Sequence, residues 1–381
     1  MYGLVLEGGG AKGAYHVGAI QAFMENGYEI GAVVGTSIGA INGAMVASKE
    51  FDKLYEAWKE LSFSSLMEID EIKLERLFNK NIDLRLLKYL SKKLKGTISN
   101  GGIDTKKMKN FISTYVDEQK VRDSDIDFGL VTVCLTDRKP LELYINEIPN
   151  GMLIDYLIAS ARLPIFKAEP LESKLYIDGG IYNNCPLNMI IKKDYKKAIV
   201  IRVTTKGKIK GTSKFNKDDL LVVEPKEELL NMVNFGNKVI NSTIELGYLD
   251  ALKVIKKLDG YNSYINPIDE NKIIEAILKY DEDKILEIGK NLNLESKLSP
   301  KKLMFEKIIP VINKKVNPRT ATKYKVFLCL VLEYIAKKEN INLLKVYDIK
   351  ELLNLVKSKI RTADKIGSEK AIYTFVKYFE I

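Results

Sequence analysis

The pentapeptide Gly35-Thr36-Ser37-Ile38-Gly39 follows an apolar run, Ile30-Gly31-Ala32-Val33-Val34. A short strand that enters G-x-S-x-G and continues into a small-residue helix has the pattern of a nucleophile elbow. Glycines are needed on both sides of the serine because the strand and the helix come very close at this turn. The strained turn lifts the serine hydroxyl clear of the backbone. The pattern therefore predicts a strand–turn–helix unit that presents Ser37 for acyl transfer, and its plainer interpretation is a helix-capping serine.

The first 257 residues alternate the patterns of strands and helices. Strands are expected at residues 2–6, 29–34, 128–135, 141–145, 175–177, 198–203 and 220–223. Helices are expected between them, at residues 11–26, 38–48 and 152–161. Continuous apolar strands that alternate with helices favour a mostly parallel sheet covered on both faces. We therefore predict an α/β fold class.

The chain has 381 residues and is long enough for more than one compact unit. Residues 51–106 interrupt the alternation with helical patterns rich in Leu, Ile and Lys. Beyond about residue 257, strand patterns almost disappear, and helices are expected at 271–279, 284–292, 301–312, 322–337, 349–358 and 369–379. We predict a catalytic domain over residues 1–260, with a helical insertion at about 51–106, and an α-helical region over residues 261–381.

Composition limits the classes of partner. The hydrophobic fraction is 46%, enough for a sizeable core, and the net charge is +10. Lysine supplies nearly all of the positive charge and is spread along the chain, which favours a solvated surface. Attraction to anionic lipid headgroups is the alternative. No arginine cluster or aromatic-plus-basic stripe marks a nucleic-acid site, so we expect no nucleic-acid partner.

Cysteine usage and the termini indicate a cellular compartment. Three cysteines lie far apart and match no metal or redox spacing: Cys134, Cys185 and Cys329. No apolar run is long enough to span a bilayer, and the N-terminus lacks the basic region of a signal peptide. We therefore expect a cytoplasmic protein with buried thiols, without a signal peptide or a transmembrane segment.

A glycine-rich loop, Gly8-Gly9-Gly10-Ala11-Lys12-Gly13, follows the first expected strand. It satisfies G-x-G-x-x-G literally, but a dinucleotide site needs a carboxylate at the end of the second strand, and Val34-Gly35-Thr36-Ser37 has none. Backbone N–H groups beside a helix N-terminus instead suit an anion. The loop therefore predicts an oxyanion hole, with the Ile38 N–H as a further donor. A plain tight turn is the alternative.

Ser37 needs a proton acceptor, and the chain offers two kinds. Its only histidine, His16, lies in the first expected helix, which must pack on the sheet. The segment Tyr176-Ile177-Asp178-Gly179-Gly180 places an aspartate at a strand end, although a simple Asp-Gly turn has the same pattern. A free aspartate with a pKa of about 4 is a poor base at neutral pH, but burial raises that pKa. Both acceptors stay open, and His16 is the less favoured.

Taken together, the motifs resemble the patatin-like phospholipase family. The resemblance rests on the glycine loop, the G-T-S-x-G-A elbow and the distal D-G-G. It also rests on two further stretches, Ala159-Ser160-Ala161-Arg162-Leu163-Pro164-Ile165-Phe166 and Asn183-Asn184-Cys185-Pro186. It covers residues 1–205 well and extends to about residue 257, whereas residues 268–381 match no part of the family core.

The resemblance implies a three-layer α/β/α sandwich and a serine lipid acyl hydrolase of the phospholipase A or lysophospholipase kind. Ser37 would be the nucleophile and Asp178 the only base of a dyad that acts through an acyl-enzyme. Gly8, Gly9 and Gly10 would belong to the oxyanion hole, and Lys12 stands where many family members have arginine. The chemistry implies no metal and no cofactor. A lipid acyltransferase with the same dyad, or a non-catalytic scaffold, is the alternative.

The lipid substrate implies contact with a membrane surface. Residues 61–69 are rich in apolar side chains, and residues 82–95 alternate leucines with Lys and Arg in an amphipathic pattern. We therefore predict peripheral membrane contact through residues 61–95. A helix that covers the sheet and exposes lysines to water is the alternative. The sequence sets no oligomeric state.

Overall fold

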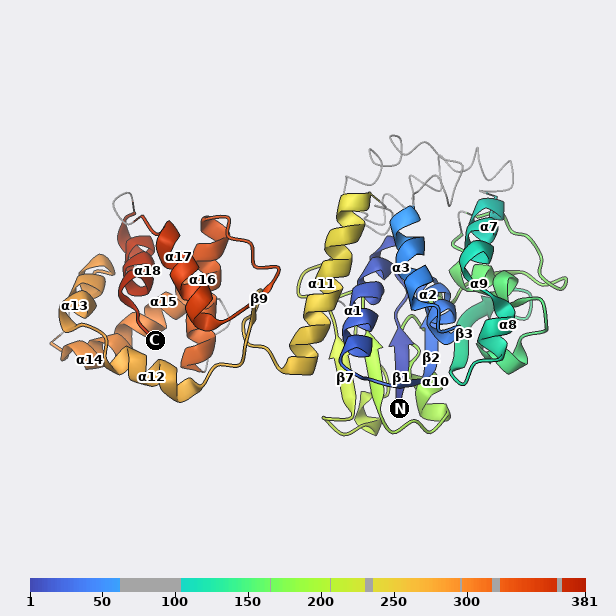
Figure 1. Ribbon diagram of the computed structural model, residues 1–381, viewed down its shortest axis with the longest axis horizontal. Coiled ribbons are helices and arrows are strands. Elements are labelled where there is room, and N and C mark those ends of the chain that lie inside the picture. Colours follow the sequence, from blue (N-terminus) through green and yellow to red (C-terminus); the bar gives the residue numbers. More distant parts are fainter. Residues whose placement is uncertain are drawn as a thin grey trace. The chain divides into compact units, whose positions relative to one another are not determined.

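The computed structural model describes residues 1–61, 104–164, 166–205, 207–229, 236–294, 297–316, 323–361 and 365–381 (Figure 1). These residues form two compact units, Met1–Val254 and Ile255–Ile381, whereas the predicted boundary lay after residue 260. Within the predicted insertion at 51–106, helix α3 (Phe51–Glu60) is described. The predicted membrane-contact segment at 61–95 lies outside the described residues, apart from Leu61.

A seven-stranded sheet forms the centre of the N-terminal unit in its described part. The strand order is β4-β3-β2-β1-β6-β7, and β5 pairs with β3. β4 and β5 run antiparallel to β3, and every other pairing is parallel. The strands are β1 (Tyr2–Leu6), β2 (Ile30–Thr36), β3 (Asp127–Cys134), β4 (Lys139–Tyr144), β5 (Tyr176–Asp178), β6 (Ala198–Ile201) and β7 (Leu220–Val223). The predicted α/β class with a mostly parallel sheet is confirmed.

Helices cover both faces of this sheet. Helix α2 (Ile38–Ala47) contacts β1, β2 and β3. On the opposite face, helix α10 (Leu187–Lys192) buries its apolar side chains against those of β1, β2 and β6. The remaining described helices of the unit are α1 (Ala14–Glu25), α3, α7 (Lys106–Tyr115), α8 (Glu118–Arg122), α9 (Leu153–Ala161) and α11 (Asn237–Lys256). The result is the three-layer α/β/α arrangement that the sequence predicts.

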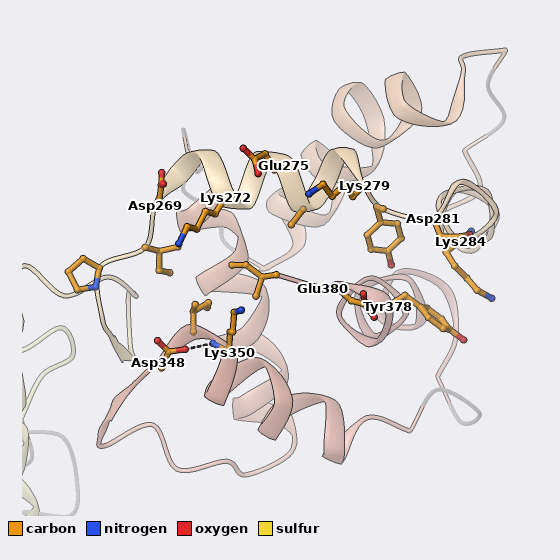
Figure 2. Close-up of a pocket in the computed structure, with 16 residues that line it drawn as sticks. Asp269, Lys272, Glu275, Lys279, Asp281, Lys284, Asp348, Lys350, Tyr378 and Glu380 are labelled. Carbon is orange, nitrogen blue, oxygen red and sulfur yellow. Dashed lines mark hydrogen bonds between the residues drawn. The ribbon is translucent and has the colours of Figure 1, made fainter.

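The C-terminal unit is almost entirely helical. Its helices are α12 (Glu270–Leu278), α13 (Glu282–Asn291), α14 (Pro300–Leu303), a π-helical turn (Met304–Ile308), α15 (Ile309–Val316), α16 (Tyr324–Lys338), α17 (Ile349–Lys359) and α18 (Gly367–Tyr378). Aspartates begin three of them by accepting a backbone N–H of the first turn, namely Asp269 at α12, Asp281 at α13 and Asp348 at α17 (Figure 2). A two-stranded pair, β8 (Tyr264–Ile265) with β9 (Val346–Tyr347), was not predicted.

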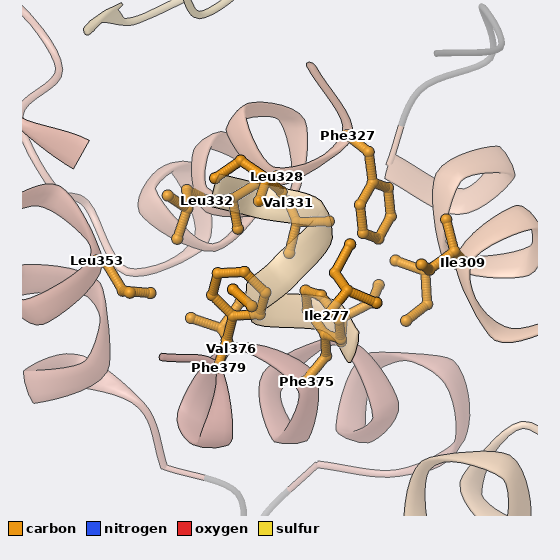
Figure 3. Packing of buried hydrophobic residues seen from close by; sticks show 14 of the residues in the cluster. Ile277, Ile309, Phe327, Leu328, Val331, Leu332, Leu353, Phe375, Val376 and Phe379 are labelled. Atoms are coloured by element: carbon orange, nitrogen blue, oxygen red, sulfur yellow. The ribbon is translucent and has the colours of Figure 1, made fainter. Parts of the chain in front are cut away.

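One apolar cluster holds the C-terminal unit together. Side chains from α12, α15, α16, α17 and α18 converge in its interior (Figure 3). Phe375 of α18 stacks against Tyr280 and contacts Phe327 and Phe379 edge-on or tilted, with ring centroids 5.4–5.7 Å apart. Such aromatic contacts add to the burial of apolar area. The unit therefore has a core of its own.

Candidate active site

Ser37 is the single residue between the end of β2 and the start of α2. Its backbone has φ 56° and ψ −126°, a conformation that costs an L-residue about 1–3 kcal/mol. The neighbouring glycines allow the close approach at this turn. A Cβ atom on Gly35 would lie 2.2 Å from the Gly39 carbonyl oxygen, and one on Gly39 would lie 2.2 Å from the Leu6 carbonyl oxygen. No side chain fits at either position, so the elbow depends on both glycines.

Two strand ends meet beside Ser37. β2 pairs with the first part of β3, where Thr36 lies opposite Val131. β5 pairs with the rest of β3 in the opposite direction, where Asp178 lies opposite Thr132. Because Val131 and Thr132 are consecutive, β2 and β5 approach each other end to end along one edge of β3. This junction brings Ser37, which follows β2, next to Asp178, which ends β5.

Asp178 is a buried carboxylate with few hydrogen-bond donors. It exposes 6% of its surface, and its Oδ1 accepts the Gly180 N–H at 2.7 Å. Burial raises the pKa of the Asp178 carboxyl above its ordinary value of 3.8, and hydrogen bonds from the Ser37 side chain and from the Gly180 N–H partly oppose this. A carboxylate with a raised pKa beside a serine side chain is suited to accept the proton of the serine hydroxyl.

The glycine loop after β1 faces the same place. Asn184 holds Gly8 on both sides, because the Gly8 N–H donates to the Asn184 carbonyl at 3.1 Å and the Asn184 Nδ2 donates to the Gly8 carbonyl at 3.0 Å. The Gly8 N–H is therefore engaged. In the part of the chain that the structure describes, the N–H groups of Gly9, Gly10 and Ile38 have no acceptor. Of the oxyanion donors predicted from the sequence, Gly8 is therefore excluded, and the amides of Gly9, Gly10 and Ile38 remain available.

The second half of the glycine loop forms the 3₁₀ turn Gly10–Gly13, which leads into α1. Ala11 and Gly13 are buried in that turn. The Lys12 Nζ lies 3.5 Å from Glu228 Oε1, and only 10% of the Lys12 side chain is exposed. Lys12 lies at a cleft of about 400 Å³. Other residues that line this cleft are Gly8, Gly9, Ser37, Asp178, Leu163, Pro164, Ile181 and Val203.

Comparison with known proteins identifies this arrangement. Residues 4–191 match the family model described as "Patatin-like phospholipase". The N-terminal unit therefore contains a patatin-like phospholipase domain over residues 4–191. The match includes the glycine loop, the elbow and the Asp178 segment.

Relatives of this patatin-like chain are larger proteins. A patatin-like phospholipase domain-containing protein of Caenorhabditis elegans is 28% identical over 76% of this chain and 21% of its own length. Lysophospholipase NTE1 of Cryptococcus neoformans is 27% identical over 75% of this chain and 16% of its own length. The chain thus spans about a fifth or less of these relatives.

Solved structures similar to the chain include VipD from Legionella pneumophila, with 14% identity, a TM-score of 0.41, and coverage of 99% of this chain and 90% of VipD. ExoU from Pseudomonas aeruginosa, in complex with SpcU, has 15% identity and a TM-score of 0.33 over 99% of this chain and 76% of that chain.

The only histidine of the patatin-like chain does not line the cleft. His16 is fully buried on α1, with its Nδ1 3.2 Å from Asn42 Nδ2. Asn42 also accepts the Trp58 indole N–H at 3.0 Å. Burial lowers the pKa of His16 to about 3, so the ring is neutral at physiological pH. His16 thus lies inside the N-terminal unit, away from the residues that line the Ser37 cleft.

Three polar residues form hydrogen bonds around the site: Ser160, Asn183 and Asn184. No role was predicted for them from the sequence. The Ser37 N–H donates to Ser160 Oγ at 2.9 Å, and the Thr36 hydroxyl donates to the Asn183 carbonyl at 2.8 Å. All three lie in the two stretches that completed the family resemblance. The sequence therefore marked these segments, but it did not show which contacts they make.

A buried glutamate supports the opposite wall of the cleft. Glu7, directly before the glycine loop, accepts the N–H groups of Val203 at 2.8 Å and Thr204 at 3.2 Å. Burial raises the pKa of the Glu7 carboxyl, and these hydrogen bonds and the nearby Arg202 act against the rise. Glu7 thereby fixes the end of β6 to the end of β1, where both border the cleft.

A larger cavity of about 900 Å³ lies in the C-terminal unit, beside α12, α13 and α17 (Figure 2). Four lysines and five acidic residues line it: Lys272, Lys279, Lys284, Lys350, Asp269, Glu275, Asp281, Asp348 and Glu380. Its charges nearly balance, and its described lining contains no serine, cysteine or histidine. We therefore take the smaller cleft at Ser37 as the candidate active site.

None of the described helices combines the length and the apolar content that crossing a membrane requires.

Proposed function

We propose that the N-terminal unit is a serine lipid acyl hydrolase that uses Ser37 and Asp178 as a catalytic dyad. The observation that carries the proposal is the end-to-end junction of β2 and β5, which joins the strained Ser37 to a buried carboxylate. The amides of Gly9, which lines the cleft, and of its near neighbours Gly10 and Ile38 are the proposed donors for an oxyanion. The match to the family model supports lipid acyl esters as the class of substrate.

The proposed reaction has two steps, and Asp178 acts in both. In the first, the Asp178 carboxylate takes the Ser37 proton as the serine oxygen bonds to the ester carbonyl carbon. The carbonyl oxygen becomes an oxyanion that the free amides stabilise, and the alcohol leaves with the proton from Asp178. In the second, Asp178 takes a proton from water, and the resulting hydroxide attacks the acyl-enzyme. The fatty acid leaves and Ser37 recovers its proton.

The cleft suits a substrate that is partly apolar and partly charged. Leu163, Pro164, Ile181 and Val203 supply apolar lining, and Lys12 and Glu228, whose charged groups lie 3.5 Å apart, supply one charge of each sign. A glycerophospholipid or lysophospholipid has both characters, and a relative is named a lysophospholipase. Because such substrates reside in lipid aggregates, the proposal includes peripheral contact with a membrane surface.

Release of fatty acid from phospholipid and lysophospholipid vesicles tests this function. The wild-type chain is expected to release fatty acid and to react covalently with a fluorophosphonate probe at Ser37. Ser37→Ala is expected to do neither while it keeps its fold by circular dichroism. An unlabelled, inactive wild type would contradict the proposal. Transfer of the acyl group to an added alcohol, in place of release to water, would show an acyltransferase instead.

A further inference from the structure

The Val131 carbonyl of β3 lies at the junction between β2 and β5. Val131 is the last β3 residue opposite β2, and the next residue, Thr132, is already opposite β5. A Cβ atom on Gly179 would lie 2.2 Å from the Val131 carbonyl oxygen, so the backbone after Asp178 packs directly on this oxygen. The Val131 carbonyl therefore lies where the two halves of the proposed dyad meet.

The Ser160 hydroxyl occupies this junction. Its Oγ accepts the Ser37 N–H at 2.9 Å, and its hydroxyl donates to the Val131 carbonyl at 2.7 Å. Ser160 is fully buried on α9, so both bonds form away from water. The Ser160 hydroxyl thus bridges the Ser37 N–H and the Val131 carbonyl. The same segment holds the other half of the dyad, because the Arg162 carbonyl accepts the Asp178 N–H at 2.8 Å.

We propose that Ser160 is a positioning residue that holds Ser37 in its strained conformation, with its hydroxyl directed at Asp178. A backbone at φ 56° and ψ −126° persists only when its surroundings enforce it. Glycine packing sets the turn, but the Ser160 bond is the contact that fixes the N–H of Ser37 itself. Without that bond, the peptide between Thr36 and Ser37 is free to rotate, and the serine hydroxyl leaves the line toward Asp178.

This inference rests on the proposed function, and its test measures the reactivity of Ser37 rather than overall turnover. The second-order rate of labelling by a soluble fluorophosphonate, measured on folded protein, reports how well Ser37 is poised. A misplacement of about 1 Å can cost roughly 100-fold in rate. Ser160→Ala is therefore expected to label at Ser37 about 10- to 100-fold more slowly than wild type.

A matched pair separates the hydroxyl from the volume of the side chain. Ser160→Thr keeps the hydroxyl and Ser160→Val replaces it with a methyl group of similar size. Ser160→Thr is expected to label several-fold faster than Ser160→Val. Ser48→Ala is the control, because Ser48 is also buried and its hydroxyl donates to the Met45 carbonyl at 2.9 Å, at the far end of α2. It is expected to label at the wild-type rate.

A second measurement does not depend on catalysis. Amide hydrogen exchange of Ser37 is expected to be slow in wild type and in Ser160→Thr, and fast in Ser160→Ala. Equal labelling rates for Ser160→Ala and Ser48→Ala, or an unprotected Ser37 amide in wild type, would overturn the role of Ser160. A wild type that is not labelled at Ser37 would instead overturn the proposed function and the inference with it.

Discussion

Two carboxylates are buried to the same extent, one in each unit, and they have opposite surroundings. Asp178 and Glu333 each expose 6% of their surface. One oxygen of Glu333 accepts three hydrogen bonds, from the Tyr261 N–H at 2.6 Å, the Ser263 N–H at 3.1 Å and the Ser263 hydroxyl at 2.6 Å. Within the described residues, Asp178 accepts one backbone N–H, from Gly180, and the Ser37 side chain beside it also favours the ionised form.

The difference separates a structural carboxylate from a reactive one. Three donors from one turn fix Glu333 in place and compensate for its burial. Asp178 lacks such compensation, so its burial raises its pKa and leaves it ready to take a proton from the group beside it. Burial alone therefore does not separate the two carboxylates, whereas the neighbouring strained Ser37 sets Asp178 apart as the proposed base.

The comparison predicts its largest effect for Asp178→Asn. This change removes the proton acceptor, and we expect kcat for lipid hydrolysis to fall about 100- to 10,000-fold. The fold should not suffer, because Asn keeps an oxygen for the Gly180 N–H. The native carboxyl binds its proton more tightly than the unfolded one, so its ionisation at neutral pH costs stability that the amide does not. A thermal melt should give a midpoint equal to or above that of wild type, and a clearly lower midpoint would contradict this account.

The second effect concerns the pH dependence of activity. The proposed reaction needs the ionised Asp178, whose pKa lies above 3.8. The pH dependence of kcat/KM reports the pKa values of the free enzyme. We therefore expect kcat/KM to fall about tenfold per pH unit below the raised pKa of Asp178. A profile measured with a soluble ester gives the position of this limb. A limb near pH 6.5 that disappears in a non-titrating His16 variant would mean that His16, not Asp178, is the base.

The third effect concerns Glu333, where we expect a change in stability and no change in the reactivity of Ser37. Glu333→Gln weakens three charge-assisted hydrogen bonds, and we expect a loss of about 1–3 kcal/mol in the unfolding of the C-terminal unit, with no loss of labelling at Ser37. Glu351→Gln is the matched control, because Glu351 is half exposed and forms a surface ion pair with Lys345 at 2.8 Å. Denaturant unfolding should show a change below about 0.5 kcal/mol there. Equal effects at the two positions would remove the basis of the comparison.

Local patterns predicted most of this architecture. The seven strands around the site and the glycines beside Ser37 follow from short-range apolar runs and from turns that only glycine fits. The role of Ser160 was not predictable, because it depends on where β2 and β5 meet along β3. The engagement of the Gly8 N–H by Asn184 is likewise a contact between distant segments. The β8–β9 pair was missed because strands of two residues carry no alternation to detect.

His16 gives an effect that is absent at neutral pH and appears only on acidification, and a local probe can follow it. The unfolded chain binds a proton at His16 below about pH 6.5, whereas the buried ring binds one only near its pKa of about 3. Stability is therefore present above pH 6.5 and is lost as the pH falls toward 3, by at most about 1.4 kcal/mol per pH unit.

His16→Gln should remove this slope, because glutamine does not titrate. Trp58 is the only tryptophan of the chain, and its indole bonds to Asn42, the neighbour of His16, so its fluorescence reports unfolding of this region. Urea unfolding of wild type and variant at pH 5, 6, 7 and 8 should give a stability difference that is constant at pH 7 and 8 and shifts in favour of the variant at pH 5. Because the other titrating groups are common to both proteins, parallel curves across the whole range would show that His16 is protonated inside the fold.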